Sequence, residues 1–113
     1  MKDTLKNLSE IVARANDLFY SKFEKLDPIM GIIDKALRKQ GIEADAITID
    51  CITLDKKIII LIHDDKPGTV GIALGNKDGD IYSSSEYAIS EISEELMIRV
   101  MEENFIINVS KQT

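Results

Sequence analysis

Ile58-Ile59-Ile60-Leu61-Ile62 is the longest uninterrupted apolar run in this sequence, and it decides the fold class. Four of its five residues are β-branched, which favours a strand. The run is far shorter than the roughly 20 apolar residues that a membrane-spanning helix needs. Burial of five such side chains contributes roughly 8–15 kcal/mol in gross terms. We therefore expect an interior strand that lies at the sheet centre or is covered on both faces.

Further strand signals lie on both sides of this run. Residues 47–52 alternate between apolar and polar side chains, the pattern of a half-buried strand. Residues 69–74 and 80–86 predict two more strands, the second polar enough to lie near an edge. The turn at residues 76–79 ends in a glycine that can take a positive φ. Consecutive strands on short turns predict a four-stranded antiparallel meander.

A long amphipathic helix is predicted before the strands. Residues 4–26 carry apolar side chains at steps of three and four, and Pro28 ends the pattern. The apolar stripe is wide and includes Phe19, Tyr20 and Phe23. The helix therefore either lies on the sheet or pairs with its copy in a homodimer, for which a sheet edge is the other candidate contact.

A second N-terminal helix is predicted over residues 28–40. Asp27 can cap it, and Pro28 suits its first position because the N–H there has no helical partner. Gly41 follows as a C-terminal cap, since glycine enters the left-handed conformation without steric cost. Gly31 inside this helix would cost about 1 kcal/mol relative to Ala, so its first turn is expected to be loose or closely packed.

The C-terminal part predicts one more helix, from about Ser90, with its apolar face packed on the sheet. Residues 105–109 form either a fifth strand or a docking arm. No internal repeat or linker interrupts the chain. We therefore expect residues 1–113 to form a single α+β domain: two N-terminal helices, a four-stranded antiparallel meander and a C-terminal helix on the sheet.

Composition excludes several classes of chemistry. The chain has 113 residues with one His and one Cys, too few for a disulfide framework or a two-histidine metal site. We predict no metal and no cofactor. The start of the chain shows no secretory signal, so a cytoplasmic location is expected.

Charge is distributed unevenly along the chain. The net charge is −6. Residues 1–40 hold eight basic and six acidic side chains, a net of +2, and residues 41–113 hold six and fourteen, a net of −8. Residues 78–103 alone hold eight acids against Arg99. Nucleic acid and anionic membranes are therefore poor partners, which leaves a solvated acidic face or a surface that attracts a basic protein.

Two polar clusters resemble ligand sites but have simpler interpretations. His63-Asp64-Asp65 could hold a metal or supply a general base, yet a single His at a strand end more often belongs to a polar loop. Residues 76, 78 and 80 have the oxygen spacing of a calcium loop. The Gly and Glu that such a loop needs later are replaced by Ile81 and Tyr87, so a hairpin turn is expected there instead.

The leading functional hypothesis is a small acidic, non-catalytic protein-interaction module, such as an inhibitor, adaptor or chaperone-like protein. No reactive constellation of side chains is evident, so an enzyme is less favoured. Glu91, Glu95 and Glu102 are expected to form an acidic stripe on the C-terminal helix that binds a partner, which would itself be basic.

The alternative is a small-ligand-binding or enzymatic α+β domain. Its pocket would lie between the helices and the sheet near Gly71 and Ala73, where small side chains let another element approach closely. His63 and Asp65 would stand at its rim.

Overall fold

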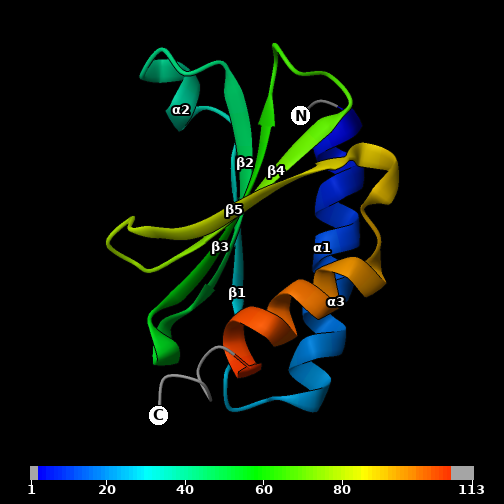
Figure 1. The fold of residues 1–113 in the computed structure, drawn as a ribbon, viewed down its shortest axis with the longest axis vertical. Helices are drawn as coiled ribbons and strands as arrows, with labels where there is room; N and C mark the ends of the chain where they lie inside the picture. Colours follow the sequence, from blue (N-terminus) through cyan, green and yellow to red (C-terminus); the bar gives the residue numbers. More distant parts are fainter. Residues whose placement is uncertain (1–2, 108–113) are drawn as a thin grey trace.

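The structure, a computed structural model that describes residues 3–107, contains one five-stranded antiparallel sheet with two helices on one of its faces (Figure 1). The strands are neighbours in chain order, β1-β2-β3-β4-β5, so the predicted antiparallel meander is present and has one more strand than expected. The helices and strands are α1 (Asp3–Lys22), β1 (Ile29–Ile33), α2 (Ala36–Lys39), β2 (Ala44–Cys51), β3 (Lys56–His63), β4 (Thr69–Gly75), β5 (Ile81–Ala88) and α3 (Glu94–Glu102). Short helical turns lie at Ile52–Leu54 (η1), Ile89–Glu91 (η2) and Glu103–Ile107 (η3).

The apolar run at residues 58–62 lies in β3, the middle strand of the sheet, as predicted. Ile58 and Ile60 are 0% and 1% exposed and belong to the core. Ile59 and Leu61 alternate with them, face the opposite side and are only half-buried. The run is therefore at the sheet centre but fully covered on one face only.

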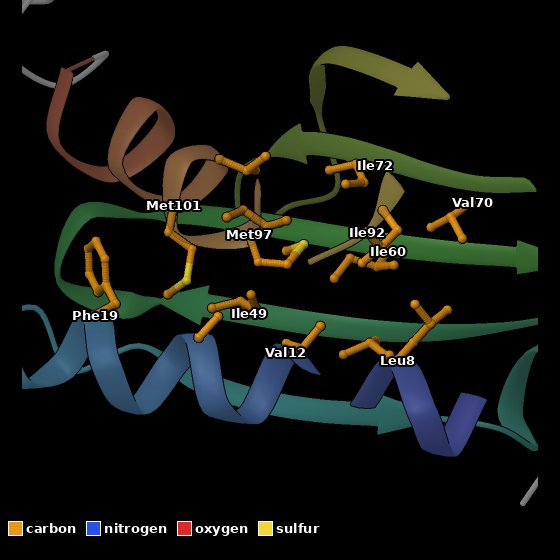
Figure 2. Close-up of a cluster of buried hydrophobic side chains, with 14 of the residues drawn as sticks. Leu8, Val12, Phe19, Ile49, Ile60, Val70, Ile72, Ile92, Met97 and Met101 are labelled. Atoms are coloured by element: carbon orange, nitrogen blue, oxygen red, sulfur yellow. The ribbon is translucent and has the colours of Figure 1, made fainter. Parts of the chain in front are cut away.

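The core lies between the sheet and the pair α1 and α3. Leu8, Val12 and Phe19 of α1 point into a cluster that also contains Ile49 of β2, Ile60 of β3, and Met97 and Met101 of α3 (Figure 2). These α1 side chains are at most 2% exposed. The apolar stripe of α1 is thus used within the chain, which leaves a sheet edge as the candidate homodimer contact. No helix within residues 3–107 is long and apolar enough to span a membrane.

The predicted second N-terminal helix is wrong over most of its length. Residues 29–33 form β1, which pairs antiparallel with β2, and only Ala36–Lys39 are α-helical. Three of the five β1 residues are isoleucine, which suits a strand, and pairing with β2 satisfies their backbone. Gly31 permits a close approach, since a Cβ there would lie 2.9 Å from Thr48 Oγ1.

The C-terminal helix begins later than predicted. Its N-cap is Ser93, whose Oγ accepts a hydrogen bond from Leu96 N at 3.1 Å. The possible strand at residues 105–109 is also corrected, because η3 is helical and Phe105 packs edge-on against Phe19 with ring centroids 5.9 Å apart. Residues 108 and 109 lie outside the described part. The fifth strand is instead β1.

Candidate functional site

Three surfaces formed by residues 3–107 are candidates for binding, and the first is the sheet face opposite α1 and α3. Along β4, Val70 and Ile72 are buried under the helices, so Gly71 and Ala73 face the other way. They do not lie beneath a helix, as the sequence suggested, because the helix side of β4 is filled by the larger residues. The small residues instead line a hollow on the face that α1 and α3 leave uncovered. Figure 1 shows both of these helices on the other face of the sheet.

A hollow of about 300 Å³ lies on this open face. His63, Gly71 and Ala73 line it together, whereas Asp65 is an exposed turn residue outside it. The hollow therefore brings together three of the four residues of the alternative ligand site, but away from the helices. Its remaining polar lining includes Lys66 and Glu86, joined by an ion pair of 3.1 Å between Nζ and Oε1.

His63-Asp64-Asp65 does not converge on one point. His63 is exposed at the end of β3, and both Asp64 carboxylate oxygens accept from Arg38, at 2.7 and 2.9 Å. Within residues 3–107 no cluster of three or more His, Cys, Asp or Glu side chains is placed to hold a metal ion. The tripeptide thus contributes one residue to the open-face hollow and another to a structural ion pair.

The sequence did not predict the hydrogen-bond network around Arg38. Arg38, from α2, donates to both oxygens of Asp45 at 3.1 and 3.0 Å as well as to Asp64. Asp45 is only 3% exposed, so its carboxylate depends on this partner. The hydrogen bonds that Arg38 donates, to Asp64 first and then to Asp45, raise the pKa of its guanidinium above the ordinary value. The sequence feature that could have indicated this network is Asp45, an acidic residue at the otherwise apolar start of β2.

The second surface is acidic and lies on α3. Glu95 and Glu102 are seven residues apart and share one side of the helix. Glu91 does not join them, because it lies in η2, where its Oε1 accepts from Ala88 N at 2.8 Å. A shallow hollow of about 390 Å³, which we call the α3 acidic hollow, is lined by Glu95, Ile98, Arg99, Glu102 and Glu103.

The calcium-like spacing at residues 76–80 belongs to a hairpin turn. Asn76 Oδ1 accepts from the backbone N–H groups of Asp78 and Asp80, at 3.0 and 3.1 Å. Asn76 N donates to the Asp80 carbonyl at 3.1 Å, which closes the turn. The oxygens of this segment therefore organise the connection between β4 and β5, as predicted.

The third surface is the outer edge of β1, where Ile29 and Ile32 are exposed. Comparison with models of protein families, with curated proteins and with solved structures gives no significant match to this chain.

Proposed function

We propose that this chain is a small acidic, non-catalytic protein-interaction module that binds a basic partner protein. The observation that carries the proposal is the α3 acidic hollow. Glu95, Glu102 and Glu103 line it together with Ile98, and Arg99 is the one cation among the lining residues. A lysine or arginine side chain of the partner fits this arrangement, because its apolar stem can cover Ile98 while its charged head meets the carboxylates.

The charge distribution supports the same partner. Residues 41–113 have a net charge of −8, and eight of their fourteen acidic residues lie within residues 78–103. A concentrated field of one sign accelerates encounter with a partner of the opposite sign and disfavours nucleic acid and anionic lipid. Cys51 is free and buried, which fits a reducing compartment such as the cytoplasm.

A double charge reversal tests the proposal. We expect Glu95→Lys with Glu102→Lys to lower capture of the partner from an extract of the native cells by about tenfold or more, because like charges then face the basic surface. The matched control is Glu10→Lys with Asp17→Lys, which makes the same change in net charge on exposed positions of α1.

The result is read as the amount of one identified protein that each immobilised variant retains at low salt. Retention by the wild type and the control, with loss from the α3 variant, supports the proposal. Equal retention by all three chains, or no retained protein, contradicts it.

The open-face hollow supports a second candidate function, the binding of a small molecule. The supporting observation is that His63, Gly71 and Ala73 line one space of about 300 Å³, the lower end of the range for ligand pockets. The polar groups of Lys66 and Glu86 stand on the same lining and could orient a ligand.

Filling the hollow tests this candidate. A Cβ at Gly71 would lie 3.9 Å from Leu61 Cβ, an ordinary contact, so Gly71→Val should fold while its side chain occupies the space. We expect mass spectrometry to detect a small molecule released from purified wild-type protein and not from Gly71→Val. Release from both proteins, or from neither, would rule this candidate out.

A further inference from the structure

β1 is an edge strand without the usual protection against pairing. Within residues 3–107 it has β2 as its one neighbour in the sheet (Figure 1). Its sequence, Ile-Met-Gly-Ile-Ile, contains no charged residue and no proline, and its register with β2 has no bulge. Ile29 and Ile32 are 51% and 40% exposed. Such an edge offers backbone N–H and C=O groups and apolar side chains to another strand.

The opposite edge of the sheet is protected. β5 carries three consecutive serines and Glu86, and its pairing with β4 shifts register between Leu74 and Gly75. Lys66 also lies against this strand through its ion pair with Glu86. Charged side chains and bulges discourage pairing with a further strand. A further strand can therefore pair with this sheet more readily at β1 than at β5.

We infer that β1 pairs antiparallel with β1 of a second copy of this chain, about a two-fold axis at Gly31. This axis places Ile29 opposite Ile33 and Met30 opposite Ile32 of the second copy. Every residue of the strand then faces an apolar residue or glycine, and the two five-stranded sheets join into one. A two-fold contact of this kind is self-complementary, since each copy supplies the same edge.

The charge distribution is compatible with a second copy as the occupant. Two chains with a net charge of −6 repel each other, so a stable contact must keep their acidic regions apart. β1 belongs to residues 1–40, whose net charge is +2, while Glu86 of β5 lies at the far edge of the sheet. The residues that flank β1 are mixed in sign, with Lys25 and Asp27 before it and Asp34 and Lys35 after it. No like-charge cluster therefore meets at the axis.

Sedimentation equilibrium tests this dimer. We expect the wild type to be dimeric towards the upper end of a range of about 1–300 µM, a weak affinity that suits a contact of five residues. Ile29→Lys and Ile32→Lys should each raise the dissociation constant by about a hundredfold, because the two-fold axis brings two lysines into every dimer. Ile81→Lys is the matched control, since Ile81 is 49% exposed on β5, and it should dimerise like the wild type.

The same experiment distinguishes a failure of this dimer from a failure of the proposed function. The α3 variant Glu95→Lys with Glu102→Lys should dimerise at least as well as the wild type, because it leaves β1 unchanged and reduces the repulsion between copies. A wild type that stays monomeric throughout the range overturns the inference, whatever partner it captures. Dimerisation of the β1 variants with the affinity of the wild type also overturns it.

Cross-linking tests the register. In a Cys51→Ala background, Ile29→Cys with Ile33→Cys should link two copies under oxidised glutathione, because directly opposite residues have Cα atoms about 4.5–5.5 Å apart, within disulfide range. Each single variant should remain unlinked, since residue 29 of one copy faces residue 33 of the other. Linking of the single variants to the same extent as the double variant would contradict an axis at Gly31.

Discussion

Asp45 is a buried acidic residue whose contact with Arg38 stabilises the local structure. Its carboxylate is almost fully buried and held by Arg38 from α2, with N···O distances of 3.1 and 3.0 Å. Removal of one partner from a buried ionic hydrogen bond leaves the other group poorly solvated. The network therefore fixes α2 against β2.

We predict that Asp45→Asn lowers the free energy of unfolding by about 1.5–3 kcal/mol, the range for hydrogen bonds to charged groups. Asp50→Asn is the control, because Asp50 pairs with Lys57 at 3.5 Å where both side chains are about one-third exposed. Its cost should stay below about 1 kcal/mol. Urea denaturation measures both, and equal costs would show that Asp45 is not held as described.

The Cys51 thiol makes the free energy of unfolding depend on pH in the alkaline range. Burial raises the pKa of its thiol above the ordinary value, and Sγ donates to the Leu26 carbonyl at 3.4 Å. The unfolded chain therefore loses this proton at a lower pH than the folded chain does. The resulting stability is complete below the thiol pKa of the unfolded chain and is lost as the pH rises above it.

We predict that the free energy of unfolding falls above about pH 8.5, with a contribution from this thiol of at most about 1.4 kcal/mol per pH unit. Cys51→Ala should remove that contribution, and denaturation curves from pH 7 to 10 measure it. An unchanged slope in the variant would show that other groups cause the pH dependence.

At the scale of single elements, Gly31 distinguishes the strand that is present from the helix that the sequence predicted. In a helix, Gly31→Ala would stabilise by about 1 kcal/mol. In β1, the new Cβ would lie 2.9 Å from Thr48 Oγ1, too close for both to stay in place.

We therefore predict that Gly31→Ala destabilises the chain by about 1–3 kcal/mol, the usual cost of overpacking. Thr48→Ala removes the clashing oxygen, so the double variant should regain much of that loss. A double-mutant cycle from denaturation data gives the coupling. A stabilising Gly31→Ala, or strictly additive effects, would contradict the pairing of β1 with β2.

The two faces of β3 should respond differently to truncation. Ile60 is 1% exposed beneath the helices, and Ile59 is half-buried on the open face. Ile60→Ala should cost about 2–5 kcal/mol because it leaves a cavity, and Ile59→Ala clearly less. Equal losses would mean that the open face is covered after all.

Local patterns predicted the meander, the long helix and the central strand because each of these depends on periodicity within its own segment. β1 was mistaken for a helix because residues 29, 32, 33, 36 and 37 are apolar at helical spacing, and its strand conformation depends on pairing with β2. Of the candidate residues, Glu95 and Glu102 line one hollow. Glu91 does not, because Ser93 caps the helix after it.

At the scale of the whole molecule, the two surfaces that we propose for binding lie in parts of the chain with different net charges. We propose that the glutamates of α3 attract a basic protein, whereas β1 lies in the N-terminal part of the chain, residues 1–40, with a net charge of +2. Because β1 and β5 are opposite edges of one sheet, pairing of two copies at β1 leaves the edge at β5 free. A dimer would thus present two acidic surfaces to its partner and could bind it with increased avidity.

Amide hydrogen exchange at two protein concentrations is the most direct test of a one-sided sheet with a free edge at β1. Exchange at about 1 µM and about 300 µM spans the affinity expected for so small a contact. We expect amides within Ile29–Ile33 to gain protection at the higher concentration and those within Ile81–Ala88 to keep the same protection. Protection of β1 that is the same at both concentrations, or that rises equally in β5, would contradict this expectation.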